Sequence, residues 1–261
     1  MASRPNGVTK DQLPGIIQPV ILGADYSAYA YVRGFVEAYG CCPIILGSSD
    51  VKSISRTRRA DYRVVEGLDE PDVLLATLRD LGEELCSRGS LPFLVTCGDF
   101  YARIVSQHRA ELERWYYTPV ADFGVLDFVT QKENFYRVCE KIGMGYPKTR
   151  FLDCSDPDGR VDDFEGKKKV FVVEDRAELE RIYSELQASC YDESLIVQEL
   201  VPGDDSHLYA VYAYADADSE VSFMVCGHVG LEDHHPGAIG NAVAIAPERC
   251  PEVEAAVARF L

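Results

Sequence analysis

Short apolar runs alternate with amphipathic segments through the first half of the chain. Four runs are predicted as strands, residues 19–25, 41–49, 62–65 and 91–99, and the first of them has the composition of a strand buried on both faces. The other segments repeat apolar residues at spacings of three and four, which predicts helices over residues 26–39, 72–88 and 100–116. This alternation predicts an α/β fold with a parallel sheet that helices cover on both faces.

Two of the predicted strands end in Gly-Asp or a near copy of it, in GAD at 23–25 and CGD at 97–99. In open α/β sheets ligands bind at the carboxyl ends of the strands, so we expect Asp25 and Asp99 to lie near a substrate crevice. A purely structural explanation is that the glycine permits a tight turn and the aspartate caps the following helix. The sequence leaves both explanations open.

The second half of the chain is patterned differently. A helix, a strand, a helix and a strand are predicted, in that order, over residues 126–142, 167–175, 176–188 and 193–206. Residues 208–230 alternate apolar with small or polar side chains around an Asp-Ala-Asp turn, which predicts an antiparallel hairpin. A last helix is predicted to begin at residue 251.

Charge and composition narrow the class of protein. The 261 residues carry a formal net charge of −17, and 47% of them are hydrophobic. Such a chain has enough apolar residues to build a core, which excludes a mostly disordered protein. The negative charge repels phosphate backbones, so we expect no nucleic-acid partner, although a local basic pocket for a nucleotide stays compatible with it.

Nine cysteines are present, without any CxxC pair, which is typical of free thiols in a reducing compartment. The first 15 residues are polar and lack the apolar stretch of a secretory leader. No apolar run reaches the length of a membrane span. We therefore expect a cytoplasmic protein without a transmembrane segment.

Several common motifs are absent from the sequence. Gly166-Lys167 has no glycine five positions before Gly166, so it is not a P-loop. Neither GxGxxG, HExxH nor GxSxG occurs. The run EDHH at 232–235 could contribute metal ligands, but neighbouring residues point in different directions, so a solvated loop is the favoured interpretation.

Four features occur in an order that suggests one chemistry. They are Lys132 before the turn GMGYPKT, the lysine run 167–169, the strand end IVQELVPGDDS at 196–206 and the hairpin after it. In this order they resemble the ATP-grasp superfamily, and most closely the D-aspartate ligases of cell-wall synthesis and their carbamoyl-phosphate-synthase-like relatives. The resemblance extends over nearly the whole chain, including PVILGADYSAYAYVRGFVEAYG and CGHVGLEDHHPGAIGNAV.

This resemblance implies a domain organisation. A Rossmann-like domain that precedes the ATP-grasp fold would occupy residues 1–125. A shortened lid subdomain would occupy residues 126–206, and residues 207–261 would begin the C-terminal ATP-grasp subdomain. The ATP-grasp fold would thus be incomplete in this chain.

The resemblance also implies roles for individual residues. It assigns ATP binding to Lys132, Lys169, Gln198, Glu199, Val201 and Asp205. In this assignment the lysines meet the phosphates, the Gln198 side chain reads the adenine amino group, and Asp205 binds the ribose. It assigns substrate or catalytic positions to Asp25, Asp99, His228 and Asn241, the last two toward the acyl phosphate or acceptor.

The implied reaction is the ATP-dependent ligation of a carboxylate and an amine through an acyl phosphate, with ATP and Mg²⁺. The partners would be an amino acid similar to D-aspartate and a carboxylate acceptor, for which a UDP-linked muropeptide is one candidate. Two alternatives stay open: a catalytically inactive relative that binds a nucleotide or amino acid, and a ligase of free amino acids or peptides.

Two departures from the family pattern bear on activity. The segment RFLDCSDPDGRVDDF at 150–164 contains no lysine, whereas relatives have a second phosphate-binding lysine between the Pro-containing turn and the lysine run. The metal ligands of the family are expected beyond the position of Leu261. We therefore expect no metal site within these 261 residues, and we expect them to be inactive by themselves.

Overall fold

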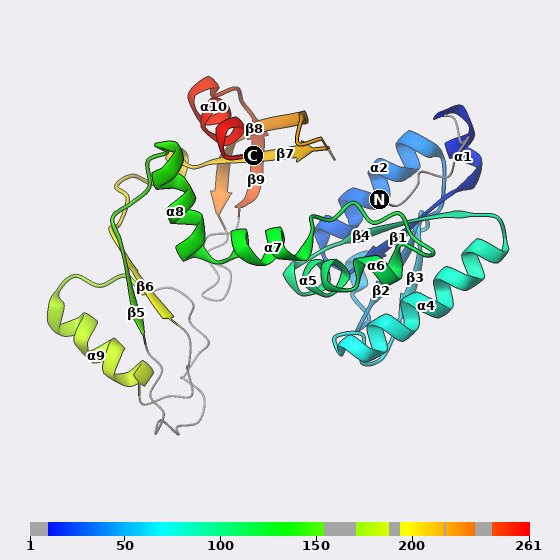
Figure 1. Ribbon diagram of the computed structural model, residues 1–261, viewed down its shortest axis with the longest axis horizontal. Helices are drawn as coiled ribbons and strands as arrows, with labels where there is room; N and C mark the ends of the chain where they lie inside the picture. The colour runs from blue at the N-terminus through cyan, green and yellow to red at the C-terminus, as the bar shows by residue number, and fades with distance from the viewer. Residues whose placement is uncertain (1–9, 154–170, 188–193, 217, 233–241) are drawn as a thin grey trace. The chain divides into compact units, whose positions relative to one another are not determined.

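The computed structural model describes residues 10–153, 171–187, 194–216, 218–232 and 242–261, and the chain forms two units in it, Met1–Gln131 and Lys132–Leu261 (Figure 1). Each unit has its own strands and helices. The division falls a few residues after the expected end of the first domain at residue 125. The expected subdivision into a lid and a C-terminal subdomain stays a prediction.

A four-stranded parallel sheet forms the centre of the first unit. In sequence order its strands are β1 (Ile17–Leu22), β2 (Ile44–Gly47), β3 (Asp61–Val64) and β4 (Leu91–Thr96). The spatial order is β3-β2-β1-β4, so β1 pairs with β2 on one side and β4 on the other. The parallel sheet predicted from the alternating pattern is confirmed.

Helices connect the strands of this sheet. The connecting helices are α2 (Tyr26–Tyr39), α3 (Lys52–Ser55) and α4 (Pro71–Ser87) (Figure 1). Before β1 come η1 (Lys10–Gln12) and α1 (Leu13–Ile16), and after β4 come α5 (Asp99–Gln107), α6 (Arg109–Leu112) and α7 (Phe123–Thr130). Because successive side chains of a strand point to opposite faces, β1 serves two cores. Val20 and Leu22 pack with α4 and α5, whereas Ile21 packs with α2 and α3.

The second unit contains two small antiparallel sheets. β5 (Thr149–Asp153) pairs with β6 (Ser194–Gln198), and β8 (Val221–Glu232) lies between β7 (Tyr209–Ala215) and β9 (Ala242–Pro247). The other elements are α8 (Lys132–Ile142), α9 (Arg176–Gln187), η2 (Asp205–His207) and α10 (Pro251–Phe260). The predicted hairpin over 208–230 is confirmed by the pairing of β7 and β8.

Three predicted elements differ from the structure. The helix over 126–142 is two helices, because Gln131 between α7 and α8 has an extended backbone with ψ of 114°. The helix over 100–116 is interrupted at His108 and ends at Leu112. The prediction of a strand over 167–175 is wrong for the part that the structure describes, because residues 171–175 form no strand.

The helices of the described segments include none that is both long and apolar enough to cross a bilayer.

Candidate functional site

The carboxyl ends of β1 and β4 lie side by side in the first unit. The amide of Cys97 donates to the carbonyl of Leu22 at 2.7 Å, and Gly23 follows β1 with φ of +98°. A Cβ atom at Gly23 would lie 2.7 Å from the carbonyl oxygen of Cys97, so only glycine fits without movement. The two turns that were expected to share one edge of the sheet therefore do so.

Asp25 and Asp99 have different local roles at this edge. Asp25 is the N-cap of α2, and its Oδ1 accepts a hydrogen bond from the amide of Ala28 at 3.0 Å. Asp99 is the first residue of α5, and Gly98 holds the cap position without a side-chain bond. The structural explanation thus holds for Asp25, whereas Asp99 is exposed and does not cap its helix.

The thiol of Cys97 is buried behind this turn. Burial, and then the carboxylate of Asp25, raise the pKa of Cys97 to about 12. The pKa of Tyr31 on α2 is raised as well, by burial first and then by Cys97 and Asp25. The thiol is therefore protonated at neutral pH and is poorly suited to act as a nucleophile.

Gln198, the last residue of β6, is held by two hydroxyl groups in the second unit. Its Nε2 donates to the hydroxyl of Tyr136 at 2.7 Å and to Oγ1 of Thr149 at 2.9 Å. Thr149 lies directly opposite Gln198 in the β5–β6 pair, and Tyr136 comes from α8. Both hydrogens of the Gln198 amide are thereby used.

The direction of these bonds follows from Thr149. Its hydroxyl donates its single proton to the carbonyl of Pro147 at 2.7 Å, so its oxygen can only accept from Gln198. This fixes which end of the Gln198 amide is the nitrogen. The amide oxygen accepts no hydrogen bond from any described residue, and it remains an available acceptor at the end of the strand.

Lys132 is close to this arrangement in the chain. It is the first residue of α8, it is exposed, and it precedes Tyr136 by four residues, which places both on one face of the helix. Tyr136 also stacks on Tyr146, with ring centroids 4.9 Å apart, and lies against Phe151 of β5, with ring centroids 6.2 Å apart. Aromatic packing thus fixes the helix that carries Lys132 against the strand pair that carries Gln198.

The segment after Gln198 is exposed and has no regular structure. The amide of Glu199 donates to the carbonyl of Lys148 at 2.9 Å, and its carboxylate lies 3.9 Å from Nζ of Lys148. Val201 is 63% exposed, and no described group bonds to its amide. An open hollow of about 500 Å³ lies alongside, lined by Tyr146, Lys148, Thr149 and Arg150.

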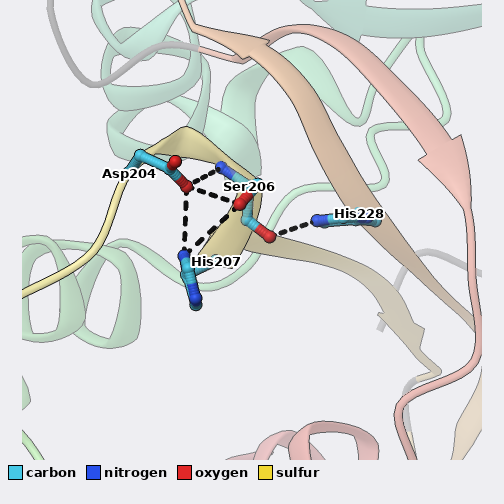
Figure 2. Close-up of polar contacts among 4 residues, drawn as sticks. All are labelled: Asp204, Ser206, His207 and His228. Atoms are coloured by element: carbon cyan, nitrogen blue, oxygen red, sulfur yellow. Dashed lines mark hydrogen bonds and ion pairs between the residues drawn. The ribbon is translucent and has the colours of Figure 1, made fainter.

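Asp204, Ser206 and His207 form a compact polar cluster in the turn before β7 (Figure 2). Oδ1 of Asp204 accepts from the hydroxyl of Ser206 and lies 3.1 Å from Nδ1 of His207. These contacts, the Ser206 hydroxyl first, lower the pKa of Asp204. In a nucleophilic triad, the serine and the acid contact opposite nitrogens of the histidine ring, whereas here both face Nδ1 of His207, so the cluster is not such a triad. The amide of Ser206 also donates to Oδ1 of Asp204, so the cluster caps a turn.

His228 on β8 is enclosed by acceptors. Its Nε2 meets the carbonyl of Ser206, as Figure 2 shows, and its Nδ1 lies 3.2 Å from Oε2 of Glu248. Tyr209 stacks on the ring at 5.0 Å between centroids and donates its hydroxyl to Glu248 at 3.2 Å. His228 would have to break one of these contacts before it could reach a substrate.

The expected site residues are thus divided between the two units. Asp25 and Asp99 belong to the first, and Lys132, Gln198, Glu199, Val201 and His228 belong to the second. Lys169 and Asn241 lie outside the described residues, as does the side chain of Asp205. The structure adds Tyr136 and Thr149, which sequence reasoning missed because they are 62 and 49 residues from Gln198.

The described part of the chain contains no group of three or more His, Cys, Asp or Glu side chains that could hold a metal ion.

No protein-family model matches the chain. It is 32% identical over 267 aligned positions to a D-aspartate ligase of Enterococcus faecium (strain Aus0004), an alignment that covers 93% of this chain and 63% of the relative. The chain therefore spans less than two thirds of that relative's length.

Solved ligases and synthetases have a similar fold. The L-amino acid ligase of Bacillus licheniformis matches with a TM-score of 0.61 at 12% identity, over 94% of this chain and 59% of that one. N5-carboxyaminoimidazole ribonucleotide synthetase of Thermus thermophilus matches with a TM-score of 0.55 at 18% identity, over 92% and 62%. The chain is thus similar in sequence to a D-aspartate ligase, and it shares its α/β fold with solved ligases and synthetases.

Proposed function

We propose that this chain belongs to an ATP-dependent carboxylate–amine ligase and carries its nucleotide-binding residues. The 32% identity to a D-aspartate ligase supports the ligase class. Because the chain spans 63% of that relative, the proposal concerns the activity of the whole ligase. The proposal includes the domain division that the resemblance implies, in which an incomplete ATP-grasp fold follows residue 125.

The fixed orientation of Gln198 is the observation that carries the proposal. Adenine presents a 6-amino donor where guanine presents an oxygen acceptor. Thr149 and Tyr136 take both hydrogens of the Gln198 amide and leave its oxygen available. An oriented acceptor at a strand end matches adenine and repels guanine. The exposed amide of Val201, three residues further on, could meet a ring nitrogen of the same base.

The remaining assigned residues complete the proposed nucleotide site. Lys132 would neutralise phosphate charge from the start of α8, and Lys169 would do so from the lid. The amide of Glu199 is bonded to the carbonyl of Lys148, but no described group donates to the carbonyl of Glu199, which therefore stays available for the base edge. Asp205 would accept from the ribose hydroxyls. Mg²⁺, which reactions of this kind use, would offset phosphate charge during transfer.

The proposed reaction has two balanced steps. A carboxylate oxygen attacks the γ-phosphorus of ATP, the bond to the β-phosphate oxygen breaks, and an acyl phosphate and ADP form. The amine nitrogen then attacks the acyl carbon, phosphate leaves and a proton is released, which produces the amide. The lysines bind and orient charged groups and perform no covalent chemistry.

We further propose that the amine is an amino acid similar to D-aspartate and that the acceptor is a peptidoglycan precursor, such as a UDP-linked muropeptide. His228, Asn241, Asp25 and Asp99 are proposed to face these substrates. The reaction is proposed to occur in the cytoplasm. The cysteines in the described segments are free, which is compatible with a reducing compartment.

The base-reading role is tested with Thr149→Val and Tyr136→Phe. Each change removes a hydroxyl that orients the Gln198 amide, so the preference for ATP over GTP should fall about tenfold in calorimetric titrations. Thr77→Val is the matched control, because the Thr77 hydroxyl bonds to a backbone carbonyl of α4 in the first unit. Equal losses of ATP and GTP affinity would contradict the assignment of Gln198.

The reaction itself is tested by ADP release from the whole ligase that the proposal concerns, with an acceptor carboxylate. Stimulation by D-aspartate and not by L-aspartate supports the proposal. Stimulation by L-amino acids without a muropeptide would favour a ligase of free amino acids. ATP binding without any amino-acid-dependent ADP release would indicate an inactive relative.

A further inference from the structure

A strongly basic segment lies between β2 and β3 in this acidic chain. Residues 50–63, which extend into β3, contain five basic and two acidic side chains, within a protein of net charge −17. Four of the basic side chains form what we call the basic surface: Lys52, Arg56, Arg58 and Arg59. All four are exposed. The local sign of the charge is thus opposite to that of the protein as a whole.

The four cations of the basic surface have no carboxylate partners within 4.0 Å among the described residues. This differs from most described arginines elsewhere, although Arg114, Arg150 and Arg259 also lack an ion pair with a described carboxylate. Ten described arginines form ion pairs, as Arg33 does with Glu37 at 3.1 Å and Arg79 does with Glu111 at 2.8 Å. Although acidic residues are abundant, the basic surface is left uncompensated.

The backbone that carries these side chains is firmly anchored. Ile54 is 1% exposed and packs into the core beneath α2, with Val51 and Ala60 against the same core. Lys52 and Arg56 are four residues apart, so they lie on the side of α3 opposite Ile54. The amide of Thr57 donates to the carbonyl of Ile54 at 2.9 Å, and the amide of Arg59 to the hydroxyl of Thr57.

We propose that the basic surface binds a phosphate-bearing ligand with at least two negative charges, of the diphosphate class. Guanidinium groups form paired hydrogen bonds with phosphate oxygens, and three of them on a fixed backbone match a diphosphate better than a single carboxylate. The rest of the protein repels polyanions, so a ligand of this class needs such a local cationic surface to approach. The site is built from residues of the first unit, and it shares no residue with the proposed nucleotide site.

Binding is tested by calorimetric titration of the whole chain with inorganic pyrophosphate. The triple variant Arg56→Gln, Arg58→Gln, Arg59→Gln should raise the Kd at least tenfold. The matched control is Arg33→Gln, Arg79→Gln, Arg88→Gln, which removes the same charge from ion-paired positions of the first unit and should leave the Kd within twofold. Equal changes in both triple variants would overturn the proposal, because net charge alone would explain them.

The variant Lys132→Gln distinguishes pyrophosphate binding at the basic surface from binding at the proposed nucleotide site of the second unit. Pyrophosphate binding at the basic surface should survive that change, whether or not the chain is a ligase. If Lys132→Gln abolishes binding and the triple arginine variant does not, the basic surface is not a phosphate site and the proposal is wrong.

The source of the phosphate is distinguished by cosedimentation with vesicles of phosphatidylglycerol or of phosphatidylcholine alone. Saturable pyrophosphate binding without vesicle binding identifies a soluble ligand. Binding to phosphatidylglycerol vesicles that the triple arginine variant loses identifies a lipid phosphate. If neither probe distinguishes the variant from its control, the proposal fails.

Discussion

At the scale of single residues, side chains of the same type have different hydrogen-bonding roles even where they occupy equivalent positions after a strand. Asp25 and Asp99 both follow a strand and a glycine, yet only Asp25 accepts a hydrogen bond from its own helix. Gln198 likewise differs from an ordinary surface glutamine because two hydroxyls take its protons. Hydrogen-bond partners, more than residue type, therefore decide what each of these polar groups can do.

Asp25→Ala should lower the free energy of unfolding by about 1 kcal/mol, because it removes the side-chain cap of α2. Asp99→Ala should change it by less than about 0.5 kcal/mol, because Asp99 is exposed and makes no cap bond. Urea titration of both variants measures the difference. Equal destabilisation would mean that Asp25 does not act chiefly as a cap.

At the scale of elements, three strands of the first unit, β1, β2 and β4, were predictable because their apolar runs are largely buried, whereas all residues of β3 are exposed or half-buried. β1, β2 and β4 each coincide with a predicted run over most of their length. The helix break at Gln131 was not predictable, because apolar spacing continues through it. At the end of α7 the Thr130 hydroxyl bonds to the carbonyl of Leu126, a local contact that spacing does not reveal.

The predicted strand over 167–175 shows a different limit. Its β-branched residues favour an extended backbone, but a strand also needs a pairing partner, and the described residues 171–175 pair with no strand. For the candidate site as well, the sequence indicates only residues that stand in recognisable local segments. Partners that reach the site through long-range folding could not be predicted. Gln198 and Lys132 stand in recognisable segments, whereas Thr149 and Tyr136 matter only because folding brings them to Gln198.

Gly23→Ala tests the junction of β1 and β4. A Cβ atom there would meet the Cys97 carbonyl at 2.7 Å, and φ is +98°, so we expect a loss of roughly 2 kcal/mol or more in the free energy of unfolding. Gly34→Ala on α2 is the matched control, since nothing lies within 4 Å of the added atom. Its helical position should gain about 0.5–1 kcal/mol. A neutral Gly23→Ala would disprove the close approach of the two strands.

At the scale of the whole molecule, acidic charge dominates and the cationic groups are local. Most described arginines are neutralised by nearby carboxylates, so the uncompensated ones at residues 56–59 stand out against a net charge of −17. Buried titratable groups add a second global property, because their protonation is coupled to folding.

Stability should fall at alkaline pH because of Cys97. Its pKa is raised from 9.0 to about 12 by burial, so the folded state keeps a proton that the unfolded state loses above pH 9. The contribution is complete below pH 9 and is lost progressively between pH 9 and about 12. For this single group the loss approaches about 1.4 kcal/mol per pH unit.

Urea unfolding between pH 8 and 10 measures this effect. Cys97→Ala should flatten the pH dependence, whatever its effect on stability at pH 8. Cys42→Ala should leave the dependence unchanged, since that thiol is exposed. An unchanged slope in Cys97→Ala would show that other groups cause the alkaline loss.

The division of β1 between two cores has an evolutionary consequence. Val20 and Leu22 belong to one core and Ile21 to the other, so no side chain of these three is shared. Substitutions on one face can accumulate without compensation on the opposite face. A single-residue insertion in the strand would instead exchange both sets of side chains at once. Lineages of this domain should therefore drift by substitution in β1 and change length in the connecting loops.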